Sequence, residues 1–183
     1  MLMFRKYRMI FLPVILCTGI AISCKKYKDN PGPTDPRLDK PYCNDPQAVN
    51  YNWGFPGKPD NSICLYPTDL FTGSYDYYDS IYDGNSNLVG QVTTTLSMTA
   101  MDHTKMRIGG FCGSSAYSFT ATRQFRAEGD SILAGGGQLF CRSADTLSGY
   151  IFKDSVVGQT VHFNLTVASD TGVYYHRGSA IKK

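Results

Sequence analysis

Three histidines and many serines are the residues through which this chain could carry out acid–base or nucleophilic chemistry. His103, His162 and His176 are the candidate bases near neutral pH. No serine lies in a Gly-x-Ser-x-Gly sequence of the kind that presents a hydrolase nucleophile. If a three-residue loop precedes the last strand, His162 and His176 both face solvent. The pattern therefore indicates no catalytic centre, and we do not expect an enzyme.

Tyrosine and aspartate gather in a short segment near residue 75. Asp76 and Asp79 lie among the tyrosines there, and Asp83 follows them. A glycosidase needs two carboxylates at a defined separation across a cleft, which residues of one strand do not supply. Ring faces and acceptor oxygens also suit sugars or peptides, so a surface binding role is an alternative. The possible binding residues are Tyr75, Tyr77, Tyr78 and Trp53.

Metal binding has two sets of candidate ligands. The oxygen-bearing side chains in the segment 43–64 are those of Asp45, Asn50, Asp60 and Asn61. They could bind calcium, but their spacing is not that of an EF-hand loop, and Asp and Asn also form turns. Cys112 and Cys141 have the wrong spacing for a compact zinc site. We predict no metal and no cofactor.

The first residues have the composition of an export signal. Arg5, Lys6 and Arg8 precede an apolar run, 9–20, that is too short to span a bilayer as a helix. Small residues follow the run, as in secretory signals. We therefore expect an exported protein, whose cysteines meet oxidising conditions and form disulfides.

The sequence Ala21-Ile22-Ser23-Cys24 resembles the lipobox of bacterial lipoproteins. That resemblance implies cleavage before Cys24 and acylation of this cysteine with palmitate or similar chains, which anchor stably when two or more are present. It also implies the outer membrane of a Gram-negative bacterium, facing either the periplasm or the surface. An ordinary signal peptide with a chance cysteine is the alternative.

Removal of the signal changes the charge balance of the chain. The segment 1–23 holds three of the 18 basic residues and none of the 15 acidic ones, so the formal net charge falls from +3 to zero. Nucleic-acid binding requires a basic surface. We therefore expect no nucleic-acid partner.

Four segments follow from these patterns: a signal peptide (1–23), a Pro-rich flexible tether (24–41), a loop module (42–68) and a β domain (69–183). Within the module, Cys43-Asn44-Asp45-Pro46-Gln47-Ala48-Val49-Asn50-Tyr51 and the later Cys64 resemble a short module of secreted bacterial proteins. A disulfide between Cys43 and Cys64 would close it. Tyr51, Trp53 and Phe55 form either a miniature core, which we favour, or an adhesive face.

From residue 70 onward, alternating runs separated by Gly, Asn, Asp and Ser predict antiparallel strands. The expected strands are 71–82, 88–99, 104–111, 116–126, 131–140, 147–153, 159–168 and 173–181. Short hairpin loops join them, at 83–87, 128–130 and 170–172 among others. The fold class is therefore all-β, an up-and-down barrel of about eight strands, with a two-sheet sandwich as the alternative. A second disulfide joins Cys112 to Cys141 if the glycine-rich segment 109–113 approaches the end of the fifth strand.

The opening Gly73-Ser74-Tyr75 and the closing segment 178–183 resemble those of lipocalin-like lipoprotein domains. The resemblance implies a barrel that holds a small apolar ligand. A barrel of this size can instead be filled by its own side chains. The residues that would fill it are Phe119, Phe125, Phe163, Leu165 and Val167.

The function expected from these features is that of a lipid-anchored envelope lipoprotein with a non-enzymatic binding or structural role. The first alternative is a carrier of a small apolar ligand inside the barrel. The second is a surface module that binds a glycan or a peptide. The signal implies one partner for the protein, the membrane, to which the lipid on Cys24 would attach it.

Overall fold

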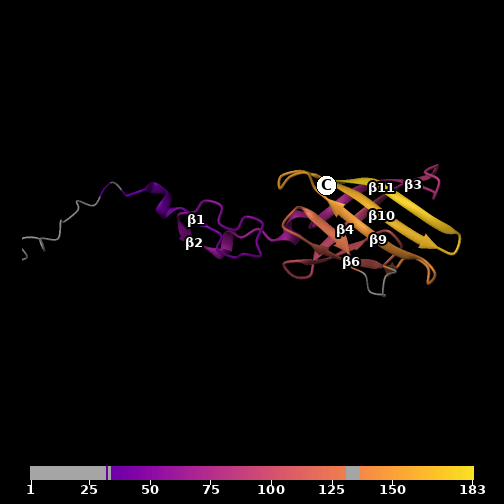
Figure 1. Ribbon diagram of the computed structural model, residues 1–183, viewed down its shortest axis with the longest axis horizontal. Coiled ribbons are helices and arrows are strands. Elements are labelled where there is room, and N and C mark those ends of the chain that lie inside the picture. Colours follow the sequence, from indigo (N-terminus) through magenta and orange to yellow (C-terminus); the bar gives the residue numbers. More distant parts are fainter. Residues whose placement is uncertain (1–31, 33, 131–136) are drawn as a thin grey trace, which may run out of the picture. The chain divides into compact units, whose positions relative to one another are not determined.

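The computed structural model describes residue 32, residues 34–130 and residues 137–183 of the chain. The expected signal peptide and Cys24 lie outside the described residues, as does most of the expected strand 131–140. The chain divides at Pro36 into two units, of which Arg37–Lys183 is the second. The second unit, which holds the loop module and the β domain, is described below (Figure 1).

The loop module is a small, locally hydrogen-bonded segment. A 3-10 turn η1 (Pro36–Asp39) is followed by β1 (Pro41–Tyr42), which pairs in parallel with β2 (Lys58–Pro59). The turn η1 and the first residue of β1 thus lie within the segment 24–41 that was expected to be a flexible tether. The turn η2 (Asn61–Ile63) precedes Cys64, and the expected Cys43–Cys64 disulfide is present.

The side chains of the candidate calcium ligands already form hydrogen bonds within the module. Asp45 Oδ1 accepts from the Gln47 amide, and Asp60 Oδ1 accepts from the amide and hydroxyl of Ser62. Asn50 bridges to Leu65 and Ile63, and Asn61 Oδ1 accepts from the Asn44 amide. Their side chains therefore serve the turn chemistry for which Asp and Asn are common.

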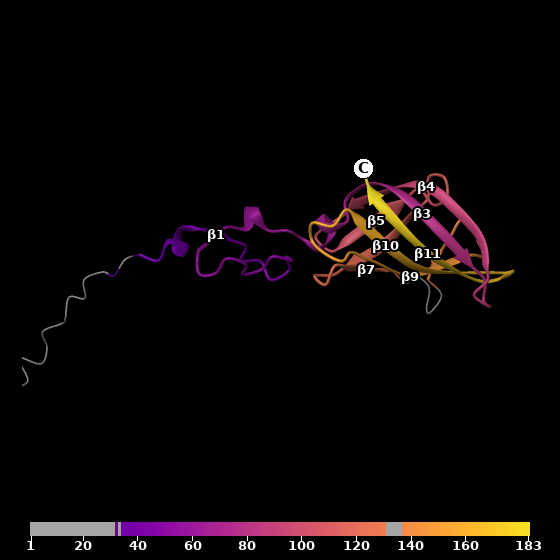
Figure 2. The same ribbon diagram turned by 90° about the horizontal axis from the view of Figure 1, so that it is seen from above.

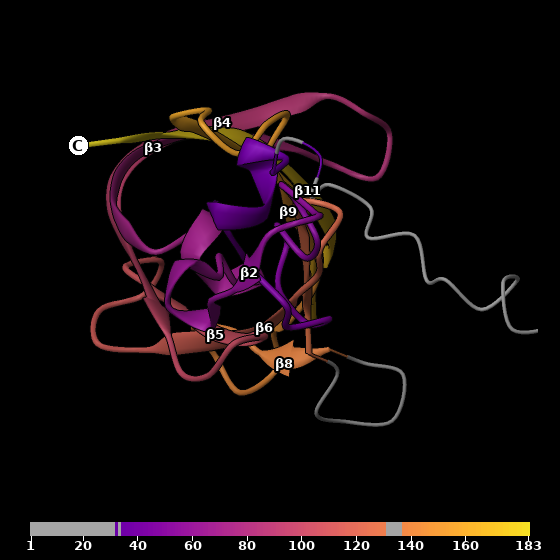
Figure 3. The same ribbon diagram turned by 90° about the vertical axis from the view of Figure 1, so that its left-hand side faces the viewer.

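After a third 3-10 turn, η3 (Pro67–Leu70), the chain forms a closed antiparallel barrel of eight strands, which excludes the open sandwich. Its strands are β3 (Gly73–Tyr82), β4 (Leu88–Ala100), β5 (Lys105–Gly109), β6 (Ala116–Ala121), β7 (Arg126–Gly129), β9 (Thr146–Phe152), β10 (Thr160–Ser169) and β11 (Gly172–Lys182). Pairing of β9 with β10, in which Leu147 lies opposite Val167, closes the ring. Figure 2 shows β11 beside β3, and the strands surround the interior in the end-on view of Figure 3.

Two of the expected strands differ from the observed ones. The strand expected over 116–126 ends at Ala121, because the chain turns at residues 122–125, where Phe125 has φ 60° and the Thr122 amide donates to Arg126 O. The segment 128–130, expected as a loop, therefore falls largely in β7. The wall position expected for 131–140 is taken by β7 and by the short β8 (Gln138–Leu139), both of which pair with β9.

Alternation along the strands fills the barrel with side chains. Phe119, Phe163, Leu165 and Val167 are buried, as the sequence predicts, and Phe125 packs partly buried against them. The interior also holds large residues that the pattern did not single out, which are Tyr75, Tyr77, Leu96, Met98, Met106 and Ile108. Burial of this much apolar surface is the main source of stability for the domain.

One end of the barrel interior is closed by η3. Leu70 and Phe71 are buried there, and the buried Lys153 donates from Nζ to Leu70 O over 2.8 Å. Burial, followed by the charge of Lys182, lowers the pKa of Lys153. The lysine thus satisfies a backbone carbonyl at the closed end.

The second expected disulfide, Cys112–Cys141, joins the segment after β5 to the segment after β8. The Tyr117 hydroxyl accepts from the Cys141 amide over 3.1 Å, and Phe140 packs against the ring of Tyr117. The Ser118 amide also donates to Gln138 Oε1, and Gln138 Nε2 donates to Ser118 O. These contacts tie β8 to β6 as well as to β9.

Candidate functional site

The tyrosines of β3 divide between the two faces of the barrel wall. Tyr75 and Tyr77 are buried in the interior, whereas Tyr78 is 49% exposed on the outside. Successive side chains of a strand point to opposite faces, so consecutive tyrosines cannot share a surface. The expectation that Tyr75 and Tyr77 line a surface site with Tyr78 is therefore wrong, and only Tyr78 remains available there.

The outer face around Tyr78 is hollowed. A depression of about 400 Å³ lies over β4, β3 and β11, where Tyr78 pairs with Thr93 and Ser179 and Ser80 pairs with Gln91 and Arg177. Asp79, Val92 and Gly178, which alternate with these positions, also line the depression. The side chains that surround it are those of Tyr78, Ser80, Gln91, Thr93, Arg177 and Ser179. All six carry a hydrogen-bonding group, and only one of them is charged.

A second depression of about 470 Å³ continues the first, because Arg177 lines both. Tyr82 and Tyr175 pair across β3 and β11 and line it with Ser86 of the β3–β4 loop. We call the two depressions together the outer groove. It presents three tyrosine rings along one side of the barrel, at Tyr78, Tyr82 and Tyr175.

Arg177 is the cation at the centre of the outer groove. Its Nη1 donates to the backbone carbonyls of Leu165 and His176 over 3.1 and 3.2 Å, and its guanidinium carbon lies 5.3 Å from the centre of the Tyr175 ring. Among the described residues no carboxylate pairs with it within 4.0 Å. Backbone carbonyls thus orient the guanidinium while leaving its remaining N–H groups for an anionic or polar ligand.

His176 faces the interior, which corrects the expectation that it faces solvent. Ser169 pairs with Gly172, so the hairpin loop has two residues rather than three, and His176 comes opposite the buried Leu165. Its Nδ1 lies 2.5 Å from Oδ2 of the buried Asp79. The other carboxylate oxygen of Asp79 and the Tyr77 hydroxyl are buried, and neither has a hydrogen-bond partner in the part of the chain that the structure describes. Burial, followed by the charge of Asp79, raises the pKa of Tyr77.

The remaining histidines lie apart from each other and from this pair. His162 faces outward as expected, where its ring stacks on Phe152 and its Nε2 lies 3.2 Å from Asp154 Oδ2. The His103 ring stacks on Tyr66, with 3.4 Å between the ring centres. No two histidines are brought together, and no hydrogen bond joins His103 to a serine within the described ranges.

The carboxylates beside His103 are already hydrogen-bonded to the backbone or to Tyr66. Asp102 Oδ1 accepts from the amides of Thr104 and Lys105, and these bonds lower the pKa of Asp102. The Gln47 amide, then the Tyr66 hydroxyl, lower the pKa of Asp45. Both groups are therefore held ionised as acceptors, which is a structural use of a carboxylate.

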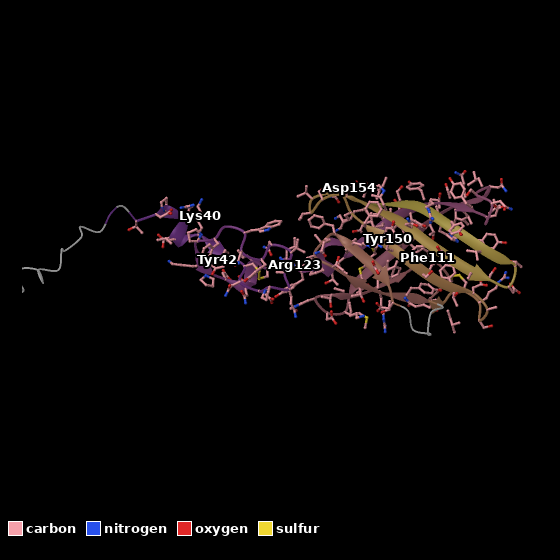
Figure 4. The ribbon with its side chains drawn as sticks, viewed as in Figure 1. Lys40, Tyr42, Phe111, Arg123, Tyr150 and Asp154 are labelled. Atoms are coloured by element: carbon pink, nitrogen blue, oxygen red, sulfur yellow. A yellow bond between two sulfur atoms is a disulfide. The ribbon has the colours of Figure 1, made fainter. Side chains whose placement is uncertain are left out.

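The aromatic residues of the module do not form the miniature core that we favoured. Trp53 is 56% exposed and Phe55 is 66% exposed, while Tyr51 is half-buried with the guanidinium of Arg123 5.7 Å from its ring centre. The module instead buries Tyr42, Cys43, Ala48 and Val49. Arg123, labelled in Figure 4, also donates to Pro46 O over 3.0 Å.

Comparison with known proteins gives no further assignment. No protein-family model matches the chain, and no curated protein matches it either.

Within the described ranges, no three His, Cys, Asp or Glu side chains are grouped so that they could hold a metal ion. No helix in the described part of the chain has the length and apolar character needed to cross a membrane.

Proposed function

We propose that the protein is a lipid-anchored envelope lipoprotein that binds a surface glycan in the outer groove of its barrel. The observation that carries the binding role is the outer groove itself, in which three tyrosine rings flank an arginine that no carboxylate of the described residues pairs with. Tyrosine offers a rigid amphipathic surface at low entropic cost, and small polar side chains adapt to a ligand's hydroxyl groups.

A glycan suits the lining of the outer groove better than an apolar ligand does. Ser80, Gln91, Thr93 and Ser179 supply both donors and acceptors, as the vicinal hydroxyls of a sugar require. Tyr78 stands beside them with its ring half-exposed, where it can pack on a sugar face. Arg177 favours sugars that bear a carboxylate, sulfate or phosphate group.

The packed interior argues against a carrier of apolar ligands. Tyr75, Tyr77, Leu96 and Phe119 are all nearly or fully inaccessible to solvent within the barrel. A carrier would keep a cavity of at least a few hundred Å³ for its ligand. In the described part of the barrel, these buried side chains take up interior space that a carrier would keep for its ligand.

Membrane attachment rests on the sequence. The lipobox-like Ala21-Ile22-Ser23-Cys24 follows a basic and apolar leader, and the two disulfides agree with an oxidising compartment. Acylation of Cys24 would hold the barrel on the envelope with the outer groove available to its surroundings. A non-enzymatic role accords with the separation of the histidines and with carboxylates engaged by backbone amides.

Metabolic labelling with palmitate tests the anchor. The wild-type protein should incorporate label and partition into detergent, whereas Cys24→Ala should lose both properties. Cys17→Ala is the matched control, because this cysteine lies within the apolar run of the leader. Equal labelling of wild type and Cys24→Ala would contradict lipid attachment at this residue.

A glycan array tests the binding role. Residues 25–183, which include the whole compact unit Arg37–Lys183, should bind a subset of bacterial or environmental polysaccharides. Tyr78→Ala should weaken that binding about tenfold or more, because loss of a central aromatic contact typically costs 1–2 kcal/mol or more. Tyr174→Ala, a tyrosine of β11 outside the outer groove, is the control. Binding that survives Tyr78→Ala unchanged would place the ligand elsewhere.

A further inference from the structure

The loop 51–57 of the module presents two large aromatic side chains to solvent. Phe55 is 66% exposed and Trp53 is 56% exposed, although each could bury a large apolar area in a core. Neighbouring exposed aromatic residues in one loop differ from the scattered apolar atoms of an ordinary protein surface. The pair therefore indicates a contact surface.

The backbone holds this loop in one conformation. The Asn52 amide donates to Cys43 O, the Trp53 amide to Asn50 O and the Phe55 amide to Asn52 O, over 2.9, 3.1 and 3.2 Å. The Phe55 ring meets the edge of the buried Tyr42, with 5.7 Å between the ring centres. The aromatic side chains thus belong to an ordered loop. Binding of a partner therefore does not carry the entropic cost of ordering this loop.

Lysines flank the base of the loop. The Lys58 amide, directly after the loop, donates to Lys40 O over 2.8 Å, and Lys40 directly precedes β1, which pairs with β2. Lys58 also pairs with Asp39 over 3.1 Å, but both side chains are highly exposed and the pair is correspondingly weak. Lys40 and Tyr42 are labelled in Figure 4. The surface thus combines an aromatic tip with a margin that holds two exposed lysines, one of them paired with Asp39.

We propose that the Trp53–Phe55 loop docks into the interface of the membrane that carries the lipid anchor. Aromatic side chains suit the boundary between acyl chains and head groups, and lysines suit anionic head groups. The lipid assigned to Cys24 rests on the proposed function. The 13 residue steps from Cys24 to Arg37 reach at most about 45 Å, so the loop stays within range of the bilayer.

Docking does not need to be tight in this arrangement. A tethered loop meets the membrane at a high effective concentration, so a weak intrinsic affinity is sufficient to keep it docked. The consequence for the protein is orientation, because a second contact beside the lipid restricts how the module stands on the membrane. The barrel and its outer groove follow the module in the same compact unit.

The test uses the fluorescence of Trp53, which is the single tryptophan of the chain. Residues 25–183 without lipid are titrated with vesicles of phosphatidylcholine and phosphatidylglycerol in a 3:1 ratio. We expect a blue shift of the emission and at least twofold protection from iodide. Phe55→Ser should raise the apparent Kd at least threefold, and Val157→Ser, which alters an exposed apolar residue of the barrel, should not.

An emission spectrum that does not change at lipid excess would overturn the proposal, as would equal vesicle binding by Phe55→Ser and wild type. A shift produced by soluble polysaccharide but not by vesicles would instead assign the loop to a glycan and also overturn it. The protein titrated lacks Cys24, so these outcomes are independent of palmitate labelling. Failure of the anchor and failure of loop docking are therefore distinguished.

Discussion

Asp79 and His176 lie on neighbouring strands and meet inside the barrel, with Asp79 Oδ2 2.5 Å from His176 Nδ1. The Asp79 side chain is 5% exposed and that of His176 is 17% exposed. Among the described residues Asp79 Oδ1 has no hydrogen-bond partner, so His176 provides the hydrogen bond that compensates for burial of this carboxyl group.

Loss of His176 should therefore be more harmful than loss of the whole pair. We expect His176→Leu to lower the free energy of unfolding by about 3 kcal/mol, because it leaves Asp79 buried without a partner. The double variant Asp79→Leu/His176→Leu should recover to within about 1 kcal/mol of wild type. Urea denaturation measures both values, and a double variant less stable than His176→Leu would contradict this account.

Removal of the Tyr77 hydroxyl should change stability in the opposite direction. This hydroxyl is buried without a hydrogen-bond partner among the described residues, and the Tyr77 ring packs against the rings of Phe111 and Phe163. Its removal in Tyr77→Phe should leave stability unchanged or raise it by about 1 kcal/mol, since a buried unpaired hydroxyl is a cost. Thermal unfolding of the two proteins is the measurement. Destabilisation by more than about 1 kcal/mol would show that the hydroxyl is paired in solution.

Acid should destabilise the barrel through Asp130. Burial raises the pKa of this group, but hydrogen bonds from Thr120 and Lys105, with the charge of Lys105, outweigh burial and lower the pKa below 3.8. As the pH falls below about 4, the unfolded chain takes up the proton first, so this contribution is present above that pH and lost below it.

Asp130→Asn isolates that contribution. The variant should be less stable than wild type by about 1.5 kcal/mol at pH 7, the value of a hydrogen bond to a charged group, and the difference should shrink by pH 2. Denaturant midpoints measured from pH 2 to pH 7 provide the comparison. A stability difference that is constant over this range would assign the effect to packing instead of charge.

The disulfide Cys112–Cys141 should contribute measurably to stability. It closes a loop of 29 residues, for which the chain-entropy model gives about 3.5 kcal/mol. The double variant Cys112→Ser/Cys141→Ser should lose an amount near this figure in urea denaturation. The corresponding change at Cys43 and Cys64, whose separation is 21, should affect the module and leave the barrel transition in place.

The all-β class and the barrel followed from the sequence because hydrophobic alternation predicts strands, and both disulfides agree with the oxidising conditions that the leader-like segment led us to expect. The orientation of His176 did not follow. One residue more or less in the loop 170–171 reverses the face of every side chain in β11, and the turn chemistry at Gly172 permits both lengths.

The outer groove was missed for a related reason. Tyr78, Ser80, Arg177 and Ser179 belong to strands far apart in the sequence, and only the β3–β11 register brings them together. The alternation that buries Tyr75 and Tyr77 was the available signal, since it leaves Tyr78 on the opposite face. The sequence held no comparable signal for the exposure of Trp53 and Phe55, because loop residues follow no alternation.

The most direct test of the proposed binding role is a calorimetric titration of residues 25–183 with a glycan selected from the array, in matched carboxylated and carboxyl-reduced forms. Wild type should bind the carboxylated form at least tenfold more tightly. Arg177→Met should remove that preference, whereas Arg107→Met, which alters an exposed arginine of β5 outside the outer groove, should retain it. Equal preference in wild type and Arg177→Met, or no measurable binding of either form, would contradict the assignment of the outer groove as the binding site.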